Sequence, residues 1–244
     1  MSRATWISWG ASVRGPAHAL SGVPNQDAWA ARHYRWGDIV AVADGIGSCA
    51  DADRGAKAAC RAVVEAARLR RRLGAAGWHD LTGLIVMLWQ MLVAPKEPKE
   101  CSATCLFVIR ERGADTHLGL LGDGLIAACR ADGGVDLLMA DKRDGFANVT
   151  VGLGSDGRSD KWLTRAAPES EHDAFVLCTD GVAEDLVPDR IEAFARELYS
   201  HYCSFPDRRR RRDLRRWLGD WPVPGHADDK TIACLHRKRA ARAE

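Results

Sequence analysis

The stretch Val40-Ala41-Val42-Ala43-Asp44-Gly45 is an apolar run that ends in an Asp-Gly pair. The runs Leu118 to Gly124 and Phe175 to Gly181 end in the same pair. Each run predicts a buried strand that delivers a carboxylate at its tip. A further acidic pair, Asp228-Asp229, stands just before the last apolar run, Ile232 to Leu235. Because a charged aspartate is rarely buried without a partner, these carboxylates suggest a shared partner, and a divalent metal ion is the simplest one.

Ligand chemistry supports this interpretation. Hard divalent cations such as Mg2+ and Mn2+ prefer oxygen ligands, chiefly carboxylate, carbonyl and water. An Asp side chain at a strand tip is short and stiff, and a neighbouring glycine exposes its backbone carbonyl. Two such ions about 3.5–4 Å apart can stabilise an in-line displacement at phosphorus. The alternative is that each Asp-Gly pair is a turn signal and nothing more. The recurrence of the pair after apolar runs, together with Asp228, favours the metal.

The composition is that of one soluble globular domain. The chain has 244 residues, 46% of them hydrophobic and 28% charged, without a linker, repeat or low-complexity block, so we expect one sizeable core. The net charge of +2 does not imply binding to nucleic acid. Basic residues gather locally at Arg68–Arg72, Arg208–Arg216 and His236–Arg242. We interpret these runs as solvated helix faces or a terminus; the alternative for Arg208–Arg216 is a helix that steers acidic or phosphorylated substrate.

The sequence carries no signal for export or membrane insertion. Met1 to Gly10 lacks the basic and apolar regions of a signal peptide, and the closest candidate for a membrane helix, Leu81 to Val93, is too short. The eight cysteines include no C-x-x-C pair, and several lie in apolar runs, so we interpret them as reduced core residues. We therefore expect a cytoplasmic monomer with no membrane or nucleic-acid partner.

Hydrophobic periodicity predicts grouped strands and peripheral helices. Arg14 to Gln26 is rich in glycine and proline and is predicted to be a loop. The strands are expected at 5–13, 28–34, 38–43, 103–111, 117–121, 125–130, 135–139, 174–179 and 232–235, and the helices at 51–73, 79–93, 188–199 and 207–218. Strict strand–helix alternation is absent, which disfavours a doubly wound sheet and suits a layered α+β fold.

Six segments, taken in order, resemble the metal-dependent protein Ser/Thr phosphatase family, type 2C, in its bacterial branch. Each motif is weak alone, but their order and approximate spacing hold over nearly the whole chain. They are Pro24-Asn25-Gln26-Asp27-Ala28, Val42-Ala43-Asp44-Gly45-Ile46-Gly47-Ser48, Ser102-Ala103-Thr104-Cys105, Leu121-Gly122-Asp123-Gly124, Cys178-Thr179-Asp180-Gly181-Val182 and Asp228-Asp229-Lys230-Thr231-Ile232.

The resemblance implies a four-layer α-β-β-α sandwich with two antiparallel sheets. It implies a catalytic domain over residues 1–236, followed by a basic tail at 237–244. It also implies two Mn2+ or Mg2+ ions. Asp44 would bridge both ions and the Gly45 carbonyl would bind one, while Asp180 and Asp228 would bind the other. Asp27 would bind an ion through a water molecule or would contact the residues that bind it. Asp123, together with Asp180, would hold a third, more weakly bound ion.

The implied reaction is attack of a metal-bridging hydroxide on phosphoserine or phosphothreonine, without a phosphoenzyme. The implied partners are a phosphorylated protein and a cognate Ser/Thr kinase or its target. Two alternatives remain at this point: a phosphatase-like module that binds phosphoprotein without turnover, and a phosphatase of a small phosphorylated ligand.

The chain departs from the family pattern in four segments. Gly22 stands where the family has a phosphate-binding Arg, and Arg14 or His18 of the same loop would replace it. His18 is also a candidate proton donor, because Ile46 stands where many relatives have a histidine after Asp-Gly. Gln26 replaces a carboxylate, and Gly124 with Leu125 replaces Ser-Arg.

One further motif is a literal G-x-G-x-x-G at Gly152 to Gly157, in the shortened region 142–168. A dinucleotide site would need a helix to start at this motif. The residues that follow, Arg158 to Trp162, are polar and aperiodic, so we interpret the match as coincidence and the segment as a loop.

Overall fold

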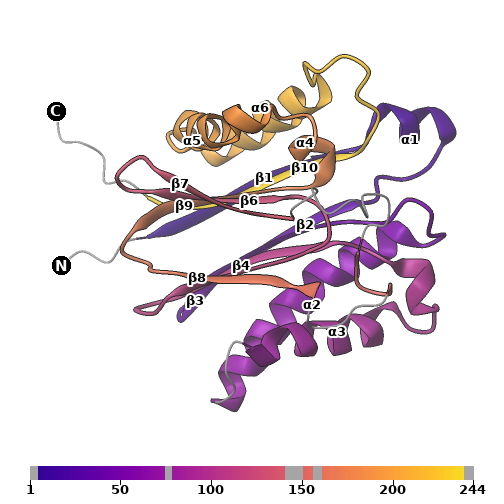
Figure 1. Ribbon diagram of the computed structural model, residues 1–244, viewed down its shortest axis with the longest axis horizontal. Helices are drawn as coiled ribbons and strands as arrows, with labels where there is room; N and C mark the ends of the chain where they lie inside the picture. Colours follow the sequence, from indigo (N-terminus) through magenta and orange to yellow (C-terminus); the bar gives the residue numbers. More distant parts are fainter. Residues whose placement is uncertain (1–4, 75–78, 141–150, 156–160, 239–244) are drawn as a thin grey trace.

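The strands of the computed structural model, which describes residues 5–74, 79–140, 151–155 and 161–238, form two five-stranded antiparallel sheets (Figure 1). In the first sheet the spatial order is β1 (Trp6–Val13), β10 (Lys230–Arg237), β9 (His172–Cys178), β6 (Leu125–Arg130), β7 (Val135–Met139). In the second it is β2 (Asp27–Tyr34), β3 (Gly37–Asp44), β4 (Cys105–Glu111), β5 (Thr116–Leu121), β8 (Leu163–Ala167).

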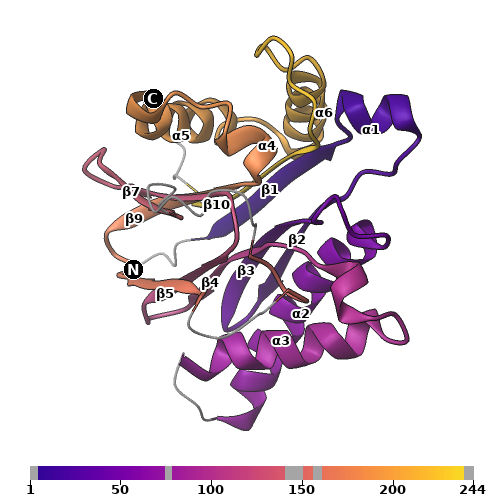
Figure 2. The ribbon, with the colours of Figure 1, turned by 45° about the vertical axis from the view of Figure 1, so that its right-hand side comes forward.

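Helices cover the outer face of each sheet, as Figures 1 and 2 show. The second sheet carries α2 (Ala52–Leu73) and α3 (His79–Val93), and the first carries α5 (Ile191–Tyr202) and α6 (Asp207–Gly219). Shorter elements are α1 (Pro16–Ser21), α4 (Asp180–Ala183) and the 3-10 turns η1 (Pro98–Cys101) and η3 (Pro188–Arg190). The expected four-layer α+β sandwich is therefore confirmed.

Strand β3 shows why its sequence is a continuous apolar run. Ile39, Ala41 and Ala43 pack against the α2 and α3 layer, whereas Val40 and Val42 face the core between the two sheets. A strand with both faces buried has no polar face, so the polar and apolar residues do not alternate. The run ends at Asp44, where the chain leaves the core.

Three short elements differ from the sequence-based expectation. Helix α1 forms inside the predicted loop, with Pro16 in its first turn and Gly22 at its C-cap with φ of 75°. It buries no residue, so it has no apolar face to detect. Strand β8 was not predicted because its first four residues are exposed at the edge of the sheet. Helix α4 has only four residues.

The predicted boundary between the catalytic domain and the basic tail, at residues 236 and 237, falls at the end of strand β10. Strand β10 continues to Arg237, which pairs with Trp6 of β1. Most of the predicted basic tail, residues 239–244, lies outside the described residues. In the part of the chain that the structure describes, no helix combines the length and the apolar character needed to cross a lipid bilayer.

Candidate metal centre

The predicted carboxylates lie where their strands begin or end at one end of the sandwich, the end at which α1 and α4 are seen in Figure 1. Asp27 opens β2 and Asp44 closes β3, and the two are direct cross-strand partners. Asp180 begins α4 just after β9, and Asp228 stands just before β10, the neighbour of β9. The antiparallel register therefore brings together residues that are far apart in the sequence.

Thr179 joins the two sheets at this end. Its Oγ1 hydroxyl donates a hydrogen bond to Asp27 Oδ2 at 2.8 Å, from the first sheet to the second. The same oxygen accepts the Thr231 N–H at 3.1 Å, and the Thr179 N–H donates to the Thr231 carbonyl at 3.1 Å. The Asp27 carboxylate is thus held by Thr179, the residue after β9, and Thr179 is itself held by Thr231 of β10.

The backbone around Asp44 is equally constrained. The Asp44 N–H donates to Thr104 Oγ1 at 2.8 Å, and the Thr104 N–H donates to the Asp44 carbonyl at 2.7 Å. The Gly45 N–H donates to the Gln26 carbonyl at 3.1 Å. A Cβ atom on Gly45 would lie 2.4 Å from the carbonyl oxygen of Ala52, so no larger residue fits there without a shift of α2.

Electrostatics show that these carboxylates crowd one another. Burial raises the pKa of Asp27 to about 7. Burial, and then the charge of Asp228, raises the pKa of Asp180 to about 6. The pKa of Asp44 is raised by burial and by the charges of Asp27 and Asp180. Without a cation, some of these groups hold a proton near neutral pH, because several buried negative charges cannot coexist uncompensated.

The donor set fits a hard divalent cation. Asp27 Oδ1 is buried and has no hydrogen-bond donor against it among the described residues. Asp44 and Asp27 approach each other as two carboxylates, which requires either a shared proton or a cation. Within the described residues no group of three or more His, Cys, Asp or Glu side chains is arranged to hold a metal ion. Mg2+ does not need one, since it is commonly bound by one or two carboxylates together with waters.

Asp123 lies in the turn between β5 and β6. The glycines on either side of it have positive φ, 91° at Gly122 and 129° at Gly124. Its charge contributes to the raised pKa of Asp180, so the two carboxylates are electrostatically linked. This placement separates Asp123 from the strand-tip pair, Asp27 and Asp44.

The family profile described as protein phosphatase 2C matches residues 14–219. The chain belongs to the protein phosphatase 2C family. The resemblance inferred from the six sequence segments is therefore confirmed. A search of curated proteins found no match.

Solved structures of similar fold include proteins with bound metals. The catalytic domain of the serine threonine protein phosphatase PstP, in complex with 2 manganese ions, is 16% identical, with a TM-score of 0.59, over 97% of this chain and 100% of that one. RsbX in complex with magnesium is 16% identical, with a TM-score of 0.61, over 97% and 100%. A C. elegans sex determining protein is 17% identical, with a TM-score of 0.68, over 96% and 65%. At these identities the likeness concerns the fold.

The structure adds a residue that the sequence reasoning missed in this phosphatase 2C chain. Asp229 is 1% exposed and accepts two backbone hydrogen bonds of 2.6 Å, from Gly15 and from Gln26. It ties the segment before β2 to the start of β10. Its place directly beside Asp228 was the signal that could have drawn attention to it.

The two candidate replacements for the family's phosphate-binding Arg lie on either side of Gly15. His18, in α1, places Nδ1 2.9 Å from Asp229 Oδ2. Arg14 is exposed, and its Nη1 donates to the Val23 carbonyl at 3.4 Å. Neither forms a hydrogen bond or an ion pair with Asp27, Asp44 or the other predicted ligands in the described part of the chain.

The described part of the G-x-G-x-x-G segment, residues 152–155, contacts the chain beside the candidate metal centre through a β-bridge. Leu153 forms a bridge with Ala103, next to the bridge between Ala103 and Gly45. No helix begins within residues 151–155, as expected for a loop, and Gly157 lies outside the described residues.

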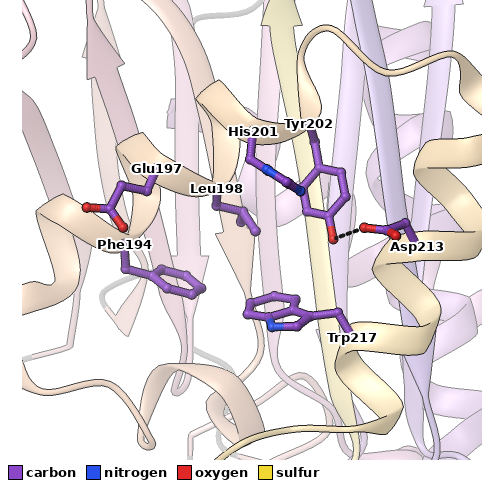
Figure 3. A pocket seen from close by; sticks show the side chains of 7 residues that line it. All are labelled: Phe194, Glu197, Leu198, His201, Tyr202, Asp213 and Trp217. Atoms are coloured by element: carbon purple, nitrogen blue, oxygen red, sulfur yellow. Dashed lines mark hydrogen bonds between the residues drawn. The ribbon is translucent and has the colours of Figure 1, made fainter.

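A separate cavity lies between α5 and α6, outside the carboxylate end (Figure 3). Its volume is about 350 Å³. Its lining is mainly aromatic and apolar, with the Tyr202 hydroxyl donating to Asp213 Oδ2 at 3.1 Å. None of the predicted site residues lines it.

Proposed function

We propose that this chain is a Mn2+- or Mg2+-dependent protein Ser/Thr phosphatase. The observation that carries the proposal is the convergence of four carboxylates, from four separate segments, at one end of the sandwich. Three of them, Asp27, Asp44 and Asp180, have a raised pKa, the electrostatic signature of a site that needs positive charge. Membership of the protein phosphatase 2C family supports the choice of reaction.

The ligand roles that we propose are those that the resemblance to the phosphatase family implies. Asp44 and the Gly45 carbonyl would hold one ion, with Asp44 shared by a second ion on Asp180 and Asp228. Asp27, fixed by Thr179, would contribute directly or through water. Cations bound there would neutralise the substrate phosphate and lower the pKa of a bound water. PstP with manganese and RsbX with magnesium support the choice of these ions.

Backbone N–H groups orient the Asp180 and Asp228 carboxylates. Asp180 Oδ1 accepts the Gly181 N–H at 2.7 Å, and Asp228 Oδ1 accepts the Asp229 N–H at 2.8 Å. In each case the second carboxylate oxygen remains for a cation. Asp123 would join Asp180 at a third, weaker position, in keeping with its place between two turn glycines.

The reaction needs a positively charged side chain that binds the substrate phosphate. It also needs a proton donor for the serine or threonine oxygen that leaves. We assign the first role to Arg14, because its exposed guanidinium has one long hydrogen bond, at 3.4 Å, to give up. We assign the second to His18, whose Nδ1 lies 2.9 Å from the buried Asp229 carboxylate.

The cellular setting is part of the proposal. All eight cysteines are free, which supports a reducing, cytoplasmic compartment. We propose a monomeric bacterial signalling enzyme that reverses the work of a Ser/Thr kinase on a protein substrate. The stressosome protein among the similar folds, at 16% identity, fits such a regulatory setting. A module that binds phosphoprotein without turnover is not favoured, since such a module has no need of crowded buried carboxylates.

Hydrolysis assays with Asp44→Asn test the proposal. With Mn2+, the wild-type protein should hydrolyse p-nitrophenyl phosphate and a phosphothreonine peptide, and the variant should lose at least about a hundredfold in kcat, on the order of 3 kcal/mol. Asp220→Asn, an exposed control, should behave as wild type. Equal turnover by wild type and Asp44→Asn would refute the assignment.

A further inference from the structure

The seven arginines of α6 divide into two sets. Three have partners within the described residues. Arg210 is buried and donates to the Tyr202 and Phe205 carbonyls, Arg209 lies over the Phe205 ring, and Arg216 is 3.6 Å from Asp220. The other four have no acidic partner among the described residues: Arg208, Arg211, Arg212 and Arg215.

These four arginines line one groove, which we call the arginine groove. Their spacing of three, four and seven residues places them on one face of α6. The groove lies between α6 and β1, which pack together, and has a volume of about 520 Å³. Its other lining residues are Gly10, Ala11, Ser12 and Trp29, so no carboxylate of the described residues lines the groove beside the guanidinium groups. Four exposed, unpaired arginines around one groove make a site for a polyanion.

The wall opposite α6 is an edge strand. Strand β1 pairs with β10 on one side and has no strand partner on the other among the described residues. The Trp29 ring lies close to Gly10, where a Cβ atom would be 2.9 Å from it. An edge strand offers unpaired backbone groups to an extended peptide. This favours a peptide over a nucleic acid as the occupant.

The groove adjoins the candidate metal centre. Ser12, which lines the groove, accepts a hydrogen bond of 2.8 Å from Asn25 Nδ2. Asn25 Oδ1 in turn accepts the Asp27 N–H at 2.9 Å. Trp29 follows Asp27 by two residues on β2. A peptide in the groove therefore has its end close to the carboxylates.

We propose that the arginine groove binds an extended acidic segment of the phosphoprotein substrate, next to the phosphorylated residue. The identification of the bound segment as part of a substrate rests on the proposed phosphatase function. The binding itself depends only on the four arginines and β1, and it can be measured without catalysis.

The first experiment measures binding of a fluorescein-labelled, unphosphorylated peptide of alternating Asp and Glu by fluorescence anisotropy. The test variant carries Arg208→Gln, Arg211→Gln, Arg212→Gln and Arg215→Gln. The control carries Arg35→Gln, Arg61→Gln, Arg71→Gln and Arg72→Gln, four exposed arginines elsewhere that give the same change of net charge. We expect the peptide to bind wild type and control alike, and the groove variant about tenfold more weakly, with affinity falling as salt rises.

The second experiment compares three substrates: p-nitrophenyl phosphate, a phosphothreonine peptide with acidic flanks and one with neutral flanks. The groove variant should keep its activity on the first and third and lose about tenfold in kcat/KM on the second, through KM. Equal binding of the acidic peptide by the groove variant and wild type would overturn the proposal, as would tighter, groove-dependent binding of a single-stranded oligonucleotide. If the wild-type protein binds the acidic peptide through the arginine groove but hydrolyses none of the three substrates, the phosphatase assignment is wrong and the peptide-binding role of the groove is supported.

Discussion

The glycines of the three Asp-Gly pairs are required by different local contacts. Gly124 has a positive φ of 129°, which a residue with a side chain rarely adopts. Gly45 and Gly181 have no such φ and are required by close packing instead. A Cβ on Gly181 would lie 2.0 Å from the carbonyl oxygen of Asp229, in the turn that also carries Asp228. One sequence pattern thus meets two physical needs at the residue scale.

Gly181→Ala should therefore be destabilising. The added methyl group meets backbone, not a flexible side chain, so the turn at Asp228 must move, at a cost of about 1–3 kcal/mol. Urea denaturation measures this change in the free energy of unfolding. The matched control is Gly83→Ala in α3, where nothing lies within 4 Å of the added atom. That change should stabilise the protein by up to about 1 kcal/mol. Equal effects of the two substitutions would contradict the packing argument.

Strands β2, β3 and β4 are joined by a polar ladder, centred on the buried Asp38 and Arg110, at the end opposite the carboxylate site. Asp38 of β3 faces His33 of β2 and Arg110 of β4. The Asp38 carboxylate accepts hydrogen bonds from Arg110 Nε at 2.8 Å and from Arg110 Nη2, and His33 Nδ1 lies 2.6 Å from it. Arg110 also pairs with Glu169 at 2.5 Å. The ladder compensates charges in otherwise apolar strands.

Arg110→Ala should be among the costly single substitutions in this sheet. Arg110 is 2% exposed, and its removal leaves the Asp38 carboxylate buried with much of its compensation gone. Breaking a buried pair in this way costs about 3–5 kcal/mol. Arg112→Ala, at an exposed position, should change stability by less than about 0.5 kcal/mol. Thermal or urea unfolding compares them, and similar stabilities for the two variants would count against the ladder.

Asp38 also predicts a dependence of stability on pH. Burial alone would raise its pKa, but the hydrogen bonds from His33 and Arg110 outweigh burial and lower the pKa. A carboxyl with a lowered pKa contributes stability above its ordinary pKa of about 3.9, and this contribution is lost as the pH falls through the folded-state value. Asp38→Asn should flatten the loss of stability between about pH 5 and pH 2. Parallel pH profiles for variant and wild type would show that Asp38 contributes no such term.

For the whole molecule, the layered fold was predictable because buried strands and the long α2 helix leave strong periodic signals. The carboxylates Asp44 and Asp180 were predictable because each ends an apolar run. Helix α1 and strand β8 were not, because they expose most of their residues and so lack an apolar pattern. The role of Asp229 depends on contacts with Gly15 and Gln26, more than two hundred residues away in the sequence. No local pattern records such a contact.

Metal binding should stabilise the whole fold. The crowded carboxylates repel one another in the metal-free chain, and a cation that binds only the folded state adds stability by mass action. Mn2+ at a hundred times its Kd adds about 2.7 kcal/mol, which corresponds to a rise in Tm of about 5–10 °C for a chain of this size. Differential scanning fluorimetry measures the shift. Asp180→Asn should reduce it, and an unchanged Tm in saturating Mn2+ would contradict the metal centre.

The most direct test of the central claim is a crystal structure of the protein soaked in Mn2+, with anomalous diffraction data collected to locate the manganese. We predict two strong anomalous peaks about 3.5–4 Å apart. Asp44 should lie between them, the Gly45 carbonyl should bind one, and Asp180 and Asp228 should bind the other. The same soak of Asp44→Asn should show weakened or absent peaks. A wild-type map with no manganese at these carboxylates, or with manganese bound only elsewhere, would contradict the account.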